Sequence, residues 1–175
     1  MIAELLQRIT SALDHAEMLY MVSGSVAMVT YTVPRMTRDI DIIIELREQD
    51  IRRFCQLFQE GYYLDEWTVQ EEVQRHGMFN IIDFKTGYKI DFMVKKNTLY
   101  RQTEFERRVR KTVLGCETWL VSIEDLIISK LIWIQELQSE RQMTDIQNLL
   151  THPDIDDIYL TGWIYELNLK TFDLL

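Results

Sequence analysis

Two aspartates two residues apart are the clearest chemical feature of the sequence. Asp39 and Asp41 lie in the run DIDIII, whose β-branched residues predict a strand from 39 to 44. Side chains at positions i and i+2 of a strand point to the same face, about 7 Å apart. Two carboxylates on one face repel each other unless a cation lies between them. The pair therefore indicates a metal site.

A third acid lies in a later strand-like segment. The apolar runs 78–84 and 88–94 are separated by Lys85-Thr86-Gly87, which is typical of an antiparallel hairpin, and Asp91 falls in the second run. A carboxylate removed from water costs several kcal/mol unless it is paired or metal-bound. By alternation, Lys89 shares the face of Asp91. The three acids form the oxygen-rich set that Mg²⁺ prefers.

A Gly-Ser turn precedes the acids. A buried strand is predicted over 18–22, it breaks at Ser23-Gly24-Ser25, and a short helix is predicted over 25–31. A strand that ends in this way and opens a helix directs free backbone N–H groups and a hydroxyl towards one point, which suits a phosphate. Turn and acids together suggest a metal-nucleotide site. Two metal ions there would serve a displacement at phosphorus.

The remaining elements must position these residues. An amphipathic helix over 2–15 is expected to pack on the sheet edge, and Ser122 is expected to cap a strongly apolar helix. The other predicted elements are a helix over 48–60, a short strand and an acidic helix within 62–76, a helix over 97–106, a strand over 117–121, the capped helix over 123–137, and helices over 140–150 and 156–169.

Composition is that of an ordinary folded protein. The 175 residues are 47% hydrophobic and 27% charged, which suits one compact domain. A formal net charge of −9 argues against a general basic field for nucleic acid. Two cysteines outside any CxxC pattern give neither a disulfide framework nor a zinc site. No apolar stretch is long enough to span a membrane, so we expect no membrane partner and a cytoplasmic location.

The motifs as a set resemble a known superfamily. Gly24-Ser25, then thirteen residues, then Asp39-Ile40-Asp41, with a third acid on a later strand, resembles the DNA polymerase β-like nucleotidyltransferases. The segments SIEDLIISKL and RQMTDIQNLL look like the helical part of the AbiEii-type and related minimal bacterial nucleotidyltransferases, some of which are toxins of toxin–antitoxin pairs. The resemblance covers residues 18 to 150.

The resemblance implies an α+β nucleotidyltransferase fold. It would have a small mixed sheet that holds the three acids and is flanked by helices, which we expect on one side. Residues 1–121 would form the nucleotidyltransferase core, and residues 122–175 a C-terminal helical segment packed on that core as part of a single compact unit.

The resemblance also implies roles for individual residues. Gly24 and Ser25 would hold the β- and γ-phosphates. Asp39 and Asp41 would bind two Mg²⁺ ions, for which Mn²⁺ could substitute. Asp91 would bind the catalytic metal and take the proton of the acceptor hydroxyl.

Five further residues are candidates for nucleotide binding. Lys130 and Asp145 match later positions of the toxins, although a lysine that lies along a core helix and a surface helix acid would explain them equally well. The remaining candidates flank the acids and would neutralise triphosphate charge, unless they only form ion pairs with the carboxylates: Arg35, Arg38 and Lys89.

The expected function is Mg²⁺-dependent transfer of a nucleoside monophosphate from an NTP such as ATP to a hydroxyl of RNA (tRNA for example), protein or a small molecule. A toxin would also have an antitoxin partner. One alternative is a non-catalytic module with this fold that binds a nucleotide or a partner, but a decayed site would not need all five motif residues. Another is a metal-dependent nuclease, which has no use for a Gly-Ser triphosphate seat.

Overall fold

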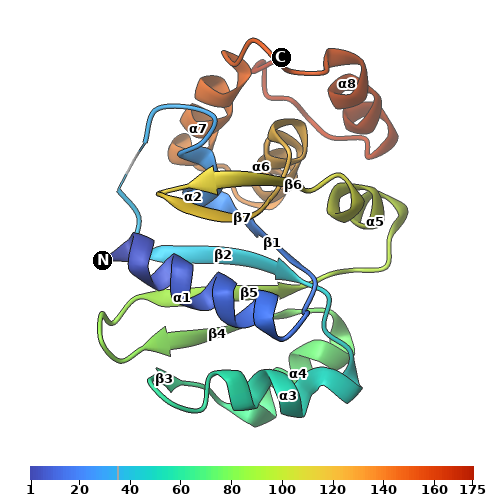
Figure 1. Ribbon diagram of the computed structural model, residues 1–175. Helices are drawn as coiled ribbons and strands as arrows, with labels where there is room; N and C mark the ends of the chain where they lie inside the picture. Colours follow the sequence, from blue (N-terminus) through green and yellow to red (C-terminus); the bar gives the residue numbers. More distant parts are fainter. Residues whose placement is uncertain (35) are drawn as a thin grey trace.

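The computed structural model describes residues 1–34 and 36–175. In this part of the chain, a seven-stranded mixed sheet is surrounded by eight α-helices (Figure 1). The strands are Tyr20–Ser23 (β1), Asp39–Ile44 (β2), Tyr62–Tyr63 (β3), Met78–Asp83 (β4), Lys89–Val94 (β5), Val109–Val113 (β6) and Cys116–Leu120 (β7).

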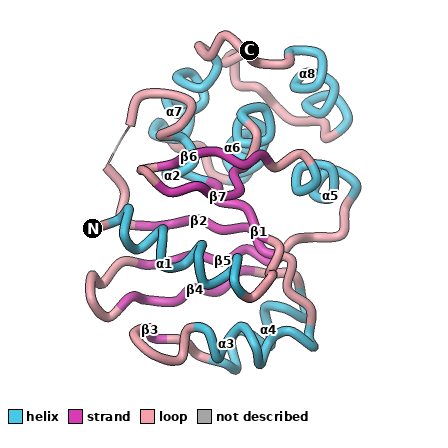
Figure 2. Tube along the Cα trace, viewed as in Figure 1, coloured by secondary structure: helices cyan, strands magenta, loops and turns pink. Residues whose placement is uncertain are grey.

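The sheet has the order β3-β4-β5-β2-β1-β7-β6 (Figure 2, strands in magenta). Strand β2 is parallel to β5 and β1 is parallel to β7, whereas the other neighbours are antiparallel. The sheet is therefore mixed, and the two strands that carry the acids, β2 and β5, lie side by side near its centre.

The helices follow the predicted pattern, with bounds that match the prediction for α1 and α7 and differ by a few residues for the others. They are Ile2–His15 (α1), Gly24–Met28 (α2), Ile51–Leu57 (α3), Glu66–Arg75 (α4), Leu99–Glu106 (α5), Ile123–Glu136 (α6), Glu140–Leu150 (α7) and Asp157–Glu166 (α8). A short 3₁₀ turn, Glu48–Asp50, precedes α3. Ser122 caps α6 as predicted, because its hydroxyl accepts a hydrogen bond from the backbone N–H of Asp125 at 3.2 Å.

The two faces of the sheet have different neighbours. One face, here called the covered face, includes Phe79 on β4 and Phe92 on β5, which stack with ring centroids 5.4 Å apart. Phe54 of α3 packs on both rings, with centroid distances of 5.4 and 5.0 Å. The opposite face, here called the acid face, includes Asp41 and Asp91, because their side chains alternate with those of the covered face.

The N-terminal helix crosses the covered face. The guanidinium of Arg8 is 2.9 Å from Asp83 on β4, and the hydroxyl of Thr10 is 3.4 Å from the thiol of Cys116 on β7. These two strands lie on opposite sides of the sheet centre, and α1 runs in front of the sheet (Figure 1). The prediction that this helix packs on the sheet edge was therefore wrong.

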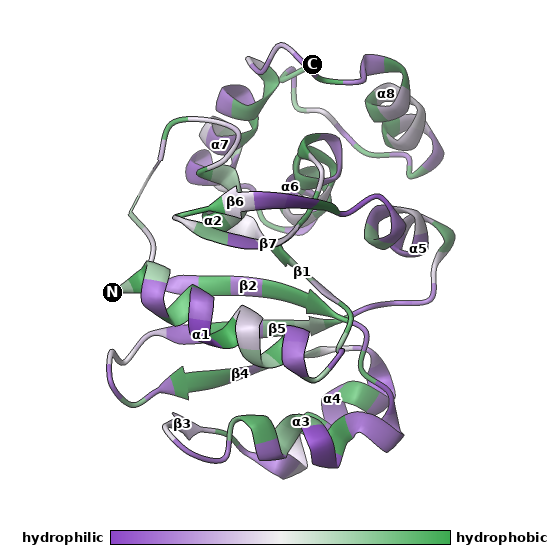
Figure 3. Cartoon of the chain, in the orientation of Figure 1, coloured by the Kyte–Doolittle hydropathy of each residue, from purple (hydrophilic) through white to green (hydrophobic). Residues whose placement is uncertain are grey.

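Amphipathicity predicted α1 without predicting its position. Figure 3 shows hydrophobic and hydrophilic residues alternating along this helix. Its buried side chains are Leu5, Leu6, Ile9, Thr10 and Leu13. Such a stripe fits any apolar surface of the right length. Helices on one side of the sheet were also expected, but α1 and α3 cover one face while α6 brings Lys130 near Asp41 on the other.

The sequence predicted neither a disulfide framework nor a membrane-spanning segment. Cys55 and Cys116 are both free and buried. None of the helices in the described ranges has the length and apolar character that crossing a bilayer requires.

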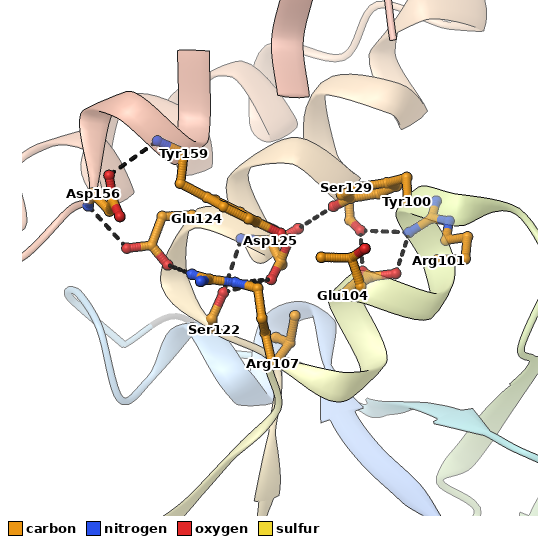
Figure 4. A network of polar contacts seen from close by, with 12 residues as sticks. Tyr100, Arg101, Glu104, Arg107, Ser122, Glu124, Asp125, Ser129, Asp156 and Tyr159 are labelled. Atoms are coloured by element: carbon orange, nitrogen blue, oxygen red, sulfur yellow. Dashed lines mark hydrogen bonds and ion pairs between the residues drawn. The ribbon is translucent and has the colours of Figure 1, made fainter. Parts of the chain in front are cut away.

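A buried polar network joins α8 to α6 and to the segment that follows α5 (Figure 4). The Arg107 guanidinium lies over the Tyr159 ring, 3.6 Å from its centroid, and contacts Glu124 at 3.1 Å and Asp125 at 3.3 Å. Asp125 is fully buried and also accepts hydrogen bonds from the hydroxyls of Tyr159 and Ser122, both at 2.8 Å. Because Arg107 is the cation facing two buried carboxylates, the attachment of α8 depends on it.

We expect Arg107→Leu to lower the free energy of unfolding by about 2–3 kcal/mol, because it leaves Glu124 and Asp125 buried without their cation. Denaturant unfolding measures this change. The matched control is Arg53→Leu, which removes a solvent-exposed pair with Asp50 at 3.4 Å and should change stability by less than about 0.5 kcal/mol. Equal losses in the two variants would contradict the assignment.

Candidate active site

The parallel pairing of β2 and β5 brings two of the predicted acids together. Asp41 is paired in register with Asp91, and Asp39, at the start of β2, is paired with Lys89. Directly paired residues point to the same face, so all four side chains lie on the acid face. Asp39 is exposed, whereas Asp41 is half-buried and Asp91 is buried. The predicted acids therefore share one surface that runs from solvent into the protein.

The Gly-Ser turn lies directly against Asp41. Ser23 is paired with Asp41 across β1 and β2, and Gly24 follows with a positive φ of 61°. A Cβ on Gly24 would collide with the Asp41 carboxylate. The backbone N–H of Ser25 donates a hydrogen bond to the same carboxylate. Glycine is thus required at position 24 for two reasons, the backbone conformation and the close approach of an acid.

Burial and like charge raise the pKa of Asp41. Removal from water is the largest cause, followed by the charges of Asp91 and Asp39. The ammonium of Lys130 and the Ser25 N–H act in the opposite direction and do not cancel these effects. Ionisation of Asp41 therefore costs free energy in the folded protein, and a bound cation would offset that cost.

The two oxygens of Asp91 have different surroundings. Oδ2 forms an ion pair with Lys89 at 3.0 Å, and this contact raises the pKa of the lysine. Oδ1 is buried and finds no hydrogen-bond partner among the residues that the structure describes. A buried carboxylate oxygen without a partner is uncommon in folded proteins and is the property expected of a metal ligand.

The donor set suits Mg²⁺ that is shared with a substrate. In the described ranges, no three or more His, Cys, Asp or Glu side chains are arranged to hold a metal ion by themselves. Mg²⁺ in nucleotide sites is characteristically bound by one or two carboxylates together with substrate phosphates. Asp41 and the unpaired Oδ1 of Asp91 fit that pattern, with Asp39 as a third, exposed carboxylate.

Lys130 and Asp145 lie together beside the acids. Both are buried, and the Lys130 ammonium is 2.8 Å from the Asp145 carboxylate and 2.8 Å from the side-chain oxygen of Gln142. This pair joins α6 to α7 and keeps the ammonium near Asp41. Asp145 is therefore a buried ion-pair partner rather than a surface acid. A role of either residue in nucleotide binding stays a prediction.

Of the two predicted arginines, the structure describes one. Arg38 is exposed and directly precedes Asp39. Arg35 lies outside the described residues, so its predicted role in nucleotide binding stays a prediction.

Two residues of the acid face were missed by sequence reasoning. Ser23 is paired with Asp41, and Asn80 on β4 is paired with Asp91, so these residues extend the row of acids at both ends. An exposed asparagine among the alternating apolar residues of β4 was a visible signal. The register of the hairpin decides which residue lies opposite this asparagine, and the sequence did not determine that register.

Comparison with known proteins gives the chain a family context. Residues 1–170 match the model of the family described as nucleotidyltransferase of unknown function (DUF6036). No protein of curated function matches the sequence.

Solved structures share the fold at low sequence identity. The solution structure of the antibiotic-resistance factor ANT(2'')-Ia matches with a TM-score of 0.65 and 13% identity over 95% of this chain and 92% of that one. The lincomycin-bound lincosamide antibiotic adenylyltransferase LnuA matches with a TM-score of 0.57 and 18% identity over 83% and 94%. A putative nucleotidyltransferase from Thermotoga maritima matches with a TM-score of 0.54 and 15% identity over 93% and 92%. The predicted α+β nucleotidyltransferase fold is confirmed.

We expect Gly24→Ala to lower the free energy of unfolding by about 2–4 kcal/mol, since the new methyl group combines backbone strain with displacement of the Asp41 carboxylate. Gly87→Ala is the matched control, because its φ of 69° is also positive but its Cβ would meet open space. That variant should lose only about 1 kcal/mol. Denaturant unfolding measures both, and equal losses would contradict the close packing of Gly24 on Asp41.

Without divalent cations, we expect Asp41→Asn to raise the Tm at pH 7 by roughly 2–4 °C, because it removes a half-buried charge next to Asp91. The raised pKa of Asp41 means that its stabilising effect is complete at low pH and is lost as the pH rises through that pKa. The difference between variant and wild type should therefore shrink towards pH 4 and also shrink on addition of Mg²⁺. Calorimetry over pH 4–8 measures it, and a lower Tm for the variant at pH 7 would contradict the account.

Proposed function

The chain belongs to this nucleotidyltransferase family, and we propose that it transfers a nucleoside monophosphate from an NTP such as ATP to a hydroxyl group, with release of diphosphate. The observation that carries the proposal is the in-register pair of Asp41 and Asp91, with one buried Asp91 oxygen left without a partner in the described residues, next to the Gly24 turn.

The residues of the site divide the work of the transfer. Gly24 allows the turn after β1 to approach the acids closely, and we assign the phosphates of the NTP to this turn and Ser25. Asp39, Asp41 and Asp91 would hold Mg²⁺, which when bound supplies charge neutralisation at the phosphates. Lys89 and Arg38 place positive charge beside the acids, where it would face the triphosphate.

The reaction conserves atoms and charge without a further reactant. The acceptor oxygen attacks the α-phosphorus, and the bond from that phosphorus to the diphosphate oxygen breaks as the new bond forms. The acceptor proton passes to the Asp91 carboxylate, the buried acid paired with Asp41. Positioning and charge stabilisation, rather than covalent catalysis, would supply the rate enhancement.

A small molecule is the acceptor class that we favour. LnuA, which shares the fold, is named as a lincosamide antibiotic adenylyltransferase and was crystallised with lincomycin bound. The acidic net charge of −9 disfavours an RNA acceptor. A toxin role and an antitoxin partner stay predictions of the sequence resemblance.

Incubation with each of four α-phosphate-labelled NTPs, Mg²⁺ and a cell extract tests the function. We expect label to pass to an acceptor with the wild type and to fall by at least about 100-fold with Asp41→Asn and Asp91→Asn, because charge stabilisation of the transferred phosphoryl group is lost. Glu117→Gln, on the exposed surface of β7, is the control and should transfer normally.

Two results would contradict the proposal. Equal transfer by Asp41→Asn and the wild type would remove the assigned chemistry. Hydrolysed nucleic acid without any incorporation of nucleotide would instead favour a metal-dependent nuclease.

A further inference from the structure

We propose that the exposed part of the acid face on β4, centred on Asn80, binds the acceptor, and that the acceptor is a small hydroxyl compound that has an apolar portion and no negative charge. This inference rests on the proposed nucleotidyl transfer. It assigns Asn80 as a residue that positions the acceptor hydroxyl beside Asp91.

The register of four strands places Asn80 in line with the acids. Ser23 is paired with Asp41, Asp41 with Asp91, and Asp91 with Asn80. These residues form one row across β1, β2, β5 and β4, with neighbouring side chains roughly 5 Å apart. The turn that we assign to the phosphates lies at the β1 end of this row, and Asn80 lies at the β4 end.

In-line displacement gives the row a direction. The attacking and leaving oxygens must lie on opposite sides of the α-phosphorus. If the diphosphate leaves on the side of Gly24, the acceptor hydroxyl approaches from the side of Asp91 and Asn80. The amide of Asn80 is exposed and can both donate and accept hydrogen bonds, so it can hold a hydroxyl in either orientation.

The surface around Asn80 is apolar and exposed. Met78 and Ile82 flank it on the same face of β4, and they are 50% and 36% exposed. Tyr63 of β3 is paired with Ile82, shares this face and is 56% exposed. The residues that lie between Met78, Asn80 and Ile82 on β4 point into the core instead. An exposed apolar platform that continues from a polar row suits a ligand with both apolar and hydroxyl parts.

The charge of the acid face disfavours an anionic acceptor. The acid face next to Asn80 carries Asp39, Asp41 and Asp91, and Lys89 is the ammonium paired with Asp91. A chain of phosphodiesters laid over Asn80 would place its charges beside these carboxylates. The face therefore favours a neutral or cationic acceptor over RNA.

The test compares wild type, Asn80→Ala and the control Thr112→Ala, which changes an exposed polar strand residue of β6 at the opposite edge of the sheet. The acceptor is the small-molecule fraction of a cell extract, titrated at fixed Mg²⁺ and α-labelled NTP, and the unfractionated extract with its RNA and protein is assayed beside it. Binding of the labelled NTP is measured separately by equilibrium dialysis. The dialysis shows whether each variant is folded and retains its nucleotide site.

For Asn80→Ala, we expect NTP binding within about twofold of wild type and a roughly tenfold rise in the half-saturating amount of acceptor fraction. The rate at saturating acceptor should change much less. Thr112→Ala should match wild type in all three measurements.

The outcomes separate this inference from the proposed function. A wild type that transfers no label in the unfractionated extract removes the proposed function, and the inference falls with it. Transfer by the wild type with an unchanged half-saturation for Asn80→Ala removes the inference alone. Loss of NTP binding in Asn80→Ala would give Asn80 a different role, and label that passes to the RNA of the unfractionated extract but not to the small-molecule fraction would overturn the acceptor class.

Discussion

Repulsion between two neighbouring carboxylates is the constraint on which the site depends. The register of β2 and β5 places Asp41 beside Asp91, where burial and like charge raise the pKa of Asp41. The Ser25 N–H and the Lys130 ammonium each offset part of this cost, but not all of it. Without a ligand, these charges repel each other at the centre of the sheet. Binding of a ligand that brings a cation is therefore favoured. The same feature that weakens the free protein would therefore strengthen binding of a metal nucleotide.

The C-terminal helices contribute to the site through one buried ion pair. Lys130 on α6 contacts Asp145 on α7 and lies close enough to Asp41 to affect its pKa. The network around Arg107 then fixes α8 against α6 (Figure 4). The helical segment thus positions a charge, and its packing is coupled to the electrostatics of the acids. A lysine of this kind serves the fold and the site together, so the structural and functional explanations of Lys130 are compatible.

The sequence predicted the elements of the site better than their spatial arrangement. The Asp39–Ile44 strand, the hairpin with Asp91 and the Gly-Ser turn were recognisable from local patterns, and the structure brings them together. The position of Asn80 was not predictable in the same way. The hairpin pairs Asp83 with Tyr88, whereas a loop of only Lys85-Thr86-Gly87 would have paired residues 84 and 88. That one-residue difference would place Ile81 opposite Asp91 and turn Asn80 away from it.

The position of the proposed acceptor surface has a consequence for specificity. Along β4, the exposed residues Met78, Asn80 and Ile82 alternate with side chains that pack in the core, such as Phe79. Substitutions at the exposed positions remove little buried area, so they can change what the face binds at small cost to the fold. The Gly24 turn has no such freedom, because Asp41 occupies the space that a side chain would need. The turn that we assign to the phosphates is therefore fixed by packing, and the proposed acceptor surface is free to vary. One fold can in this way combine a constant transfer chemistry with different acceptors.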